Sequence, residues 1–465
     1  MRLDNLVCVL DKNGKQLSRP TSETDGSSNI KTIWEGYGWN VREIPDGNSF
    51  DEIIPVYESL NYISKPTIII AYTEKGKYLG EVENSPCGYH TISSCPIEIV
   101  NESIALQQKF LKRTDLDVIE LVKNKVAHKV FPLEIKPAEA IETNIEIQNS
   151  FDKDNLVDTL VNYVRVLQPT IERQNARLYF LTADLIRKDQ VDELGIRNPT
   201  TYLDVGIREQ HMFGLAHGIS QTDQNARILI NAGDAFLYRS LDQLHACAQS
   251  RSPMVIVGDD GGLSGAKNGS THQSSGQSGA LITMPGIRFL EPADNQDLVN
   301  CLNLAFTEYN CPTYIRLHTL PVKNFDNLKR TVDNYIVFES KSLPELTMVC
   351  SGMVVSKCIE AAEILEERGV SSRVINVVNP KSLGKKFNNL IVNDKPCLCV
   401  YNGNPFVLTS AVSESILGSN RVNTPSVLNG HGFELGTSGA LEDLLKYFKL
   451  DGPGIANIIS CGLLG

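Results

Sequence analysis

The sequence predicts an α/β protein of three open domains, and three observations support this fold class. The chain has 465 residues, which is enough for roughly two to four domains with cores of their own. Hydrophobic residues make up 42% of the chain and charged residues 21%, as in ordinary globular proteins. Short apolar runs alternate with amphipathic helical runs, and this alternation is typical of parallel sheets covered by helices.

The first block, residues 1–137, already shows this alternation. Its expected strands are Leu6–Leu10 and Thr67–Tyr72, and its expected helices are Ile30–Tyr37 and Phe50–Ile63. A polar stretch, Glu139–Asn155, follows and has the composition of a linker. We therefore expect the first domain to end near residue 137.

The second block, residues 156–325, and the third, residues 340–465, continue the pattern. The expected strands of the second block are Arg177–Leu181, Thr201–Val205, Arg227–Ile230, Met254–Gly258, Arg288–Leu290 and Thr313–Leu317. The third block has an expected strand at Leu346–Cys350 and expected helices at Val355–Arg368 and Ala440–Phe448. Because ligands bind beyond the carboxyl ends of the strands in such sheets, we expect chemistry in the loops after Asp204, Gly233 and Asp259.

Composition narrows the class of partner. The net charge of -11 argues against nucleic acid and against an anionic membrane surface. No apolar run reaches membrane-spanning length, and the first residues do not form a secretory signal. The 11 cysteines are scattered without metal-ligand spacing, and Cys397 and Cys399 stand on an expected buried strand. We expect a cytoplasmic protein with reduced thiols.

Residues 202–218 carry the strongest functional signal. A strand ends at Asp204, a glycine makes a tight turn, and Glu209 begins an amphipathic helix. A carboxylate there is favourable for the helix alone, because it faces the free N–H groups of the first turn. The stretch also closely resembles the pyrimidine-binding domain of the transketolase family, which includes 1-deoxy-D-xylulose-5-phosphate synthase. The resemblance implies that Glu209 is catalytic: it hydrogen-bonds the aminopyrimidine ring of thiamine diphosphate and promotes proton removal from the thiazolium ring.

The resemblance extends over nearly the whole chain. The second block is similar to the pyrimidine-binding domain and the third to the C-terminal domain of the family. The first block resembles only the later part of the diphosphate-binding domain, through the phrases at 3–14, 35–39 and 65–76. The fold it implies is therefore three open α/β domains of the transketolase type, the first of them incomplete.

The resemblance also implies half of a metal site. Family members hold the cofactor diphosphate through Mg²⁺ or Ca²⁺, bound by an Asp of a Gly-Asp-Gly motif, an Asn and a backbone carbonyl, which are ligands suited to a hard cation. Asn13 and the carbonyl of Lys15 match the second half, whereas the Gly-Asp-Gly half would precede Met1. The alternative for Asn13 is an ordinary Lys-Asn-Gly turn after a strand.

Three further positions match cofactor contacts of the family, and a fourth departs from it. Phe236 matches the aromatic residue that stacks on the aminopyrimidine, and Arg239 matches a polar contact of the synthase branch. Asp184 matches an acidic residue beside the cofactor, although a cap on a following helix is the alternative. The family aromatic three residues before Phe236 is Gly233 here, which predicts a gap in the pocket around the ring.

The substrate end of the site is implied by two histidines. His272 matches the family residue that contacts the donor sugar, and Asn268 replaces an Asp that contacts a substrate hydroxyl; an amide still hydrogen-bonds a hydroxyl but carries no charge. His90 matches a histidine facing the diphosphate and the substrate.

The phosphate-binding Arg of the family falls at Leu317 or His318, after the strand residue Arg316. Neither position offers the bidentate grip of Arg.

The resemblance implies a thiamine-diphosphate-dependent transferase, a transketolase that moves a two-carbon ketol unit between sugar phosphates, with Mg²⁺ or Ca²⁺ as the metal. In the family the cofactor lies between two subunits, so a homodimer is expected. Two alternatives remain open. One is a 1-deoxy-D-xylulose-5-phosphate synthase-like enzyme. The other is a non-catalytic or half-site subunit, in a hetero-oligomer with a partner that supplies the Gly-Asp-Gly motif.

Overall fold

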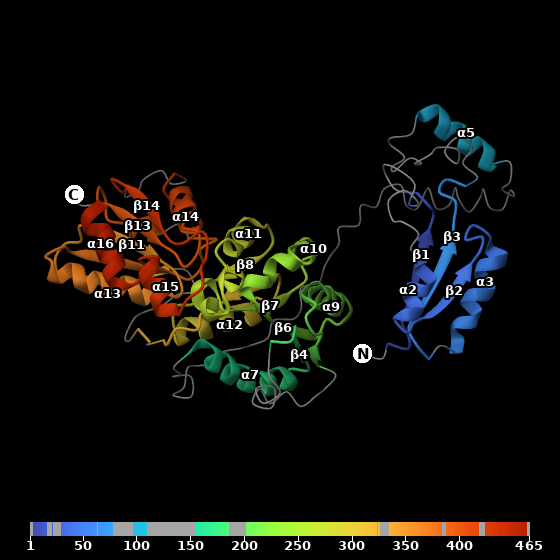
Figure 1. Cartoon of the computed structure of the whole chain (residues 1–465), viewed down its shortest axis with the longest axis horizontal. Coiled ribbons are helices and arrows are strands. Elements are labelled where there is room, and N and C mark those ends of the chain that lie inside the picture. Colours follow the sequence, from blue (N-terminus) through green and yellow to red (C-terminus); the bar gives the residue numbers. More distant parts are fainter. Residues whose placement is uncertain are drawn as a thin grey trace. The chain divides into compact units, whose positions relative to one another are not determined.

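The computed structural model describes residues 3–15, 21, 29–62, 64–77, 96–108, 155–185, 201–322, 324–325, 334–383, 387–417 and 424–462 (Figure 1). The chain divides into two compact units, Met1–Glu134 and Ile135–Gly465, which are described one at a time. None of the helices in these ranges combines the length and the apolar character that crossing a membrane requires.

The first unit contains a three-stranded parallel sheet in the order β1-β3-β2. Its elements are β1 (Val7–Lys12), α2 (Ile30–Gly36), β2 (Asn40–Ile44), α3 (Phe50–Glu58), η1 (Ser59–Tyr62), β3 (Thr67–Tyr72) and α5 (Ile97–Gln108). The central strand β3 buries Ile68, Ile69 and Ile70. By contrast, Val9 on β1 is 54% exposed. Within the described residues, β1 is thus an edge strand with an apolar side chain facing solvent.

Both strands expected in this block are present, and β2 is an addition. The helix expected over Phe50–Ile63 is shorter: α3 ends at Glu58 and continues as the 3-10 turn η1. The expected linker lies outside the described residues except for Asn155.

The second sheet has six strands in the order β5-β4-β6-β7-β9-β8, and all of its pairings are parallel. The strands are β4 (Arg177–Thr182), β5 (Tyr202–Asp204), β6 (Ala226–Gly233), β7 (Met254–Asp259), β8 (Arg288–Leu290) and β9 (Pro312–Arg316). Its helical elements are α7 (Leu156–Arg173), α9 (Glu209–Thr222), η4 (Asp234–Ser240), α10 (Leu241–Gln249), η5 (Gly262–Asn268), η6 (Ser270–His272), α11 (Gln277–Thr283) and α12 (Asn295–Thr307). Every strand expected here from an apolar run is confirmed within a few residues.

The helix α7 illustrates why the sequence folds this way. Asn155 caps it, accepting the backbone N–H of Asp158 on its side chain. Apolar residues then recur every three or four positions and are buried: Leu156, Leu160, Val164, Leu167 and Ile171. This stripe packs with α12 and one face of the second sheet in a single hydrophobic core.

The third sheet has five strands in the order β10-β12-β11-β13-β14. Its elements are β10 (Asn334–Glu339), β11 (Leu346–Cys350), α13 (Val354–Glu367), β12 (Ser372–Val377), η7 (Phe387–Asn389), β13 (Cys397–Val400), α14 (Phe406–Leu417), β14 (Leu428–His431), α15 (Leu441–Tyr447) and α16 (Gly452–Gly462). The strand β10, which the sequence pattern did not indicate, runs antiparallel to β12, so this sheet is mixed. As expected, Cys397 and Cys399 lie on a buried strand.

Candidate active site

The carboxyl ends of β5, β6 and β7 bring three loops together, as expected for an open parallel sheet. Glu209 follows β5 and is the first residue of α9. The turn before it needs a glycine because Gly206 has a φ of +67°. Glu209 is only 6% exposed, and it stands in the first turn of the helix, where negative charge is favourable.

Four residues predicted for the site form a continuous set of contacts. An oxygen of Glu209, Oε1, accepts a charged hydrogen bond of 2.9 Å from Arg239. The Arg239 guanidinium lies 4.7 Å from the ring centroid of Phe236, within the range of a cation–π contact. That ring meets the ring of His272 edge to face, with centroids 5.2 Å apart and planes at 78°. The structure therefore assembles Glu209, Arg239, Phe236 and His272 from three separate loops.

Gly233 packs directly against the ring of Phe236. A Cβ at this position would lie 2.8 Å from a ring carbon of Phe236, which is closer than Cβ atoms approach other groups. The ring of Phe236 therefore lies against the bare backbone of Gly233, while the expected gap around a bound cofactor ring stays a prediction.

Asp184 and Asn268 lie near the same edge but outside this set of contacts. Asp184 has a φ of +60°, and its backbone N–H donates to Asp204 Oδ1 at 3.1 Å. The same oxygen accepts the N–H of Gly206 at 2.8 Å, so Asp204 ties the end of β4 to the turn before Glu209. Asn268 is exposed at the end of η5. His90 lies outside the described residues.

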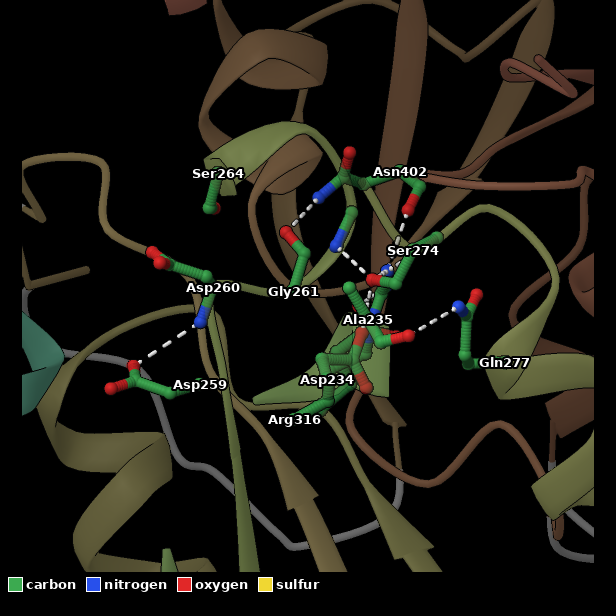
Figure 2. Close-up of polar contacts among 12 residues, drawn as sticks. Asp234, Ala235, Asp259, Asp260, Gly261, Ser264, Ser274, Gln277, Arg316 and Asn402 are labelled. Atoms are coloured by element: carbon green, nitrogen blue, oxygen red, sulfur yellow. Dashed lines mark hydrogen bonds and ion pairs between the residues drawn. The ribbon is translucent and has the colours of Figure 1, made fainter. Parts of the chain in front are cut away.

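Arg316 is the centre of a buried network that the sequence did not reveal (Figure 2). It lies on the expected strand, as the last residue of β9, but is only 1% exposed. Its Nε donates to Asp234 at 2.7 Å, and another nitrogen donates to Glu291 at 2.7 Å. A third nitrogen donates to the carbonyls of Ser274 and Asn402, both at 3.0 Å. Arg316 thus neutralises two buried carboxylates. It also joins the domain built on the six-stranded sheet, called here the second domain, to the domain built on the five-stranded sheet, called here the third domain.

Asp234 also accepts a hydrogen bond of 2.6 Å from the hydroxyl of Tyr314. Burial first, and then the charge of Asp234, raises the pKa of Tyr314 well above its ordinary value. The phenol therefore remains a donor to Asp234, which stands two residues before Phe236.

Two groups near these loops have strongly shifted pKa values. Burial, reinforced by neighbouring Asp260, raises the pKa of Asp259 to about 6. Burial lowers the pKa of His318 to about 4, and the charge of Arg316 adds to this effect. Among the described residues, neither ring nitrogen of His318 makes a regular hydrogen bond. His318 is neutral and Leu317 is 1% exposed, so neither supplies a cation at the position of the family's phosphate-binding Arg.

The candidate metal ligands lie in the first unit. Asn13 Oδ1 accepts the backbone N–H of Lys15 at 3.0 Å. This hydrogen bond belongs to the Lys-Asn-Gly turn that the sequence analysis gave as the alternative to a metal ligand. Asn13 Nδ2 donates to Asp11 at 3.3 Å, and Asp11 also hydrogen-bonds Thr73. The described residues contain no group of three or more acidic, His or Cys side chains able to hold a metal ion. Asp11, which the sequence reasoning missed, is the additional carboxylate at this position.

Comparison with known proteins identifies the family of this chain. Residues 169–323 match the family model of the transketolase pyrimidine binding domain, and residues 336–455 match that of the transketolase C-terminal domain. The chain belongs to the transketolase family. It is 27% identical over 297 residues to 1-deoxy-D-xylulose-5-phosphate synthase of Clostridium tetani, an alignment that covers 62% of this chain and 46% of that protein. The chain thus spans about half of the length of this curated relative.

Solved structures give the same fold at lower identity. The transketolase of Campylobacter jejuni has a TM-score of 0.72 and 18% identity, covering 99% of this chain and 73% of its own. A split gene transketolase, solved as an inactive beta4 tetramer, has a TM-score of 0.54 and 18% identity, covering 67% of this chain and 98% of its own. Members of the family use thiamine diphosphate and a divalent metal.

Proposed function

We propose that this chain supplies the pyrimidine-binding half of a thiamine-diphosphate-dependent enzyme that transfers a two-carbon ketol unit between sugar phosphates. The observation that supports this most is the contact set of Glu209, Arg239, Phe236 and His272. Four residues predicted from the family resemblance come from loops far apart in sequence, and they meet at one end of the second sheet.

The residues fit the pyrimidine end of the cofactor. Glu209 is held at a helix start with a carboxylate oxygen directed toward Arg239, and it can accept a hydrogen bond from a ring N–H. Phe236 offers a flat face for stacking on an aromatic ring. The guanidinium of Arg239 lies over that face and on Glu209, so a bound ring displaces it toward solvent, where 51% of the side chain is already exposed. When bound, the cofactor supplies the carbanion that attacks a ketose carbonyl.

The substrate end is proposed to use His272 and Asn268. His272 is fixed edge-on to Phe236, and its Nδ1 lies 3.1 Å from the hydroxyl of Thr271. It is positioned to hydrogen-bond the oxygens of a donor sugar. Asn268, exposed on the same loop, offers an uncharged partner for a hydroxyl. Asp184 and His90 belong to this proposal on the family resemblance alone.

The diphosphate end needs groups beyond the described residues. Asp11 and Asn13 are oxygen donors, but they do not complete a metal site, so we assign no step to a metal. We propose that residues 1–137 form the later part of a diphosphate-binding domain, and that a further strand pairs with the exposed edge of β1. A partner subunit carrying a Gly-Asp-Gly motif is one source of this strand and of the missing metal ligand, and the existence of a split gene transketolase supports such a partner. Assembly as a homodimer or hetero-oligomer in the cytoplasm is part of this proposal.

One observation favours the synthase branch as a second candidate. Leu317 and the neutral His318 leave the donor-phosphate position without a cation, whereas Arg239 matches a contact of that branch. A synthase-like reaction, whose two-carbon donor is pyruvate, needs no donor phosphate contact. A half-site subunit without activity of its own is the remaining alternative.

Titration calorimetry with thiamine diphosphate and Mg²⁺ tests the proposal. We expect micromolar binding by the chain, or by its complex with a partner that carries Gly-Asp-Gly. Phe236→Ala should weaken it by about tenfold or more, since stacking on an aromatic ring contributes roughly 1 kcal/mol beyond area burial. Tyr447→Ala, which removes an exposed aromatic ring from α15, is the matched control. Equal affinity for the wild type and Phe236→Ala would refute the proposed pyrimidine site.

A further inference from the structure

The segment 261–275, called here the His272 loop, is fixed at both of its ends by residues of the third domain. We infer that the third domain positions His272 and that Asn402 is the main positioning residue. The catalytic role of His272 in this inference rests on the proposed function, whereas the anchoring of the loop rests on the contacts alone.

The first end of the His272 loop is held by the side chain of Asn402, two residues beyond β13 (Figure 2). Asn402 Oδ1 accepts the backbone N–H of Leu263 at 3.0 Å, and Nδ2 donates to the carbonyl of Gly261 at 3.1 Å. Asn402 is only 1% exposed, so these bonds form in a water-excluded place where an unpaired amide is costly. One side chain therefore satisfies two backbone groups at the beginning of the loop.

The far end is held by two other segments of the third domain. Gln273, the residue after His272, donates from its side chain to the carbonyl of Thr437 at 2.6 Å. The backbone N–H of Asn404 donates to the carbonyl of Ser275 at 2.8 Å. Gln273 is only 7% exposed, and Ser275 is held through its backbone carbonyl. The third domain therefore restrains the chain close to the imidazole of His272.

The two ends are also tied to each other and to Phe236. The N–H of Gly262 donates to Ser274 Oγ at 2.6 Å, and the N–H of Ser274 donates to the carbonyl of Gly262 at 3.1 Å. Ser274 Oγ also hydrogen-bonds Asp234, at the start of the element that carries Phe236. The edge-to-face geometry of His272 and Phe236 therefore depends on a loop whose anchor is Asn402.

Hydrogen exchange of the intact chain tests this without any ligand. We expect Asn402→Ala to raise amide exchange in peptides covering 261–275 by about tenfold or more, because two buried backbone groups lose their partner. Asn388→Ala is the matched control. Asn388 is 4% exposed in the same domain, and its amide donates to the Ser415 carbonyl at 2.7 Å while its oxygen accepts the Ser415 hydroxyl at 2.9 Å. This control should raise exchange near residues 388 and 415 only.

A second variant, Gln273→Met, removes the donor to the Thr437 carbonyl. It still tests the inference if Asn402→Ala fails to fold. It should raise exchange at the far end of the His272 loop. The inference is overturned if folded Asn402→Ala or Gln273→Met leaves the loop protected as in the wild type. It is equally overturned if Asn388→Ala exposes the loop to the same extent.

A binding measurement separates this inference from the proposed function. If the wild type binds thiamine diphosphate, Asn402→Ala should keep its affinity within about threefold, because Asn402 contacts neither Glu209 nor Arg239, and should lose donor-sugar turnover through kcat. Loss of affinity equal to the loss of turnover would reject a positioning role. If the wild type does not bind the cofactor, the proposed function fails, while the exchange experiment still decides whether the third domain fixes the loop.

Discussion

His318 offers a measurement of burial that needs no ligand. In the folded chain burial lowers its pKa to about 4, against an ordinary value of 6.5. The unfolded chain therefore takes up a proton as the pH falls through about 6.5, while the folded chain stays neutral until about 4. Since the unfolded state binds more protons in this window, His318 makes folding less favourable as the pH falls. The loss is complete below the folded pKa.

The magnitude follows from the two values. Between about pH 7 and about pH 4.5 the proton linkage of His318 lowers the free energy of unfolding by about 2.5 kcal/mol. His318→Gln keeps a polar side chain of similar size and removes the titration. We expect the free energy of unfolding of the wild type, relative to His318→Gln, to fall by about 2.5 kcal/mol over this range.

Urea denaturation at a series of pH values, followed by circular dichroism, provides both curves, and their difference cancels the titration of every other group. The unit Ile135–Gly465 holds His318 and most of the ordered core, so its transition is the one to follow. A constant difference between wild type and His318→Gln would refute the reasoning. It would show that the imidazole is hydrated or takes a proton in the folded state.

Two further substitutions test the charges beside the candidate site. The pKa of Asp259 is raised to about 6, so as the pH falls the folded state binds this proton before the unfolded state does. The free energy of unfolding of the wild type, relative to Asp259→Asn, should therefore rise by about 2 kcal/mol from about pH 7 to about pH 4.5. The same urea series checks this, and a fall on acidification would contradict it. Arg316→Met leaves two buried carboxylates without a counter-charge and should cost about 3–5 kcal/mol. Thermal denaturation measures this cost, and the double variant Asp234→Asn/Arg316→Met should recover part of it. If the double variant recovers none of the lost stability, the ion pair between Arg316 and Asp234 does not stabilise the buried network.

The apolar strands could be predicted because each is a short run rich in apolar residues. The strands β3, β8 and β11 have the bounds expected from the sequence. The strand β2 was not predicted because Asn, Arg and Glu outnumber its apolar residues and do not alternate with them, and it becomes a strand by pairing with β3. The antiparallel β10 lies at a sheet edge, where pairing with β12 rather than a buried apolar run determines its conformation.

The candidate site divides in a similar way. Glu209, Phe236 and His272 stand in local motifs that can be recognised in the sequence. The residues that hold them in place carry no local signal. Arg316 stands in a strand where an isolated Arg normally faces solvent, and Asn402 acts on a carbonyl 141 residues away in the chain. Such partners follow from tertiary packing, which spacing along the chain does not encode.

The buried position of Arg316 has a consequence for building chimeras. Its hydrogen bond to the carbonyl of Asn402 means that the second and third domains share one desolvated guanidinium. A crossover between homologous genes at the start of the third domain would separate that group from its acceptor and from the side-chain amide beside it. Functional exchange of the third domain therefore requires transplanting both Arg316 and the 261–275 segment with it, so the exchanged unit is larger than the domain.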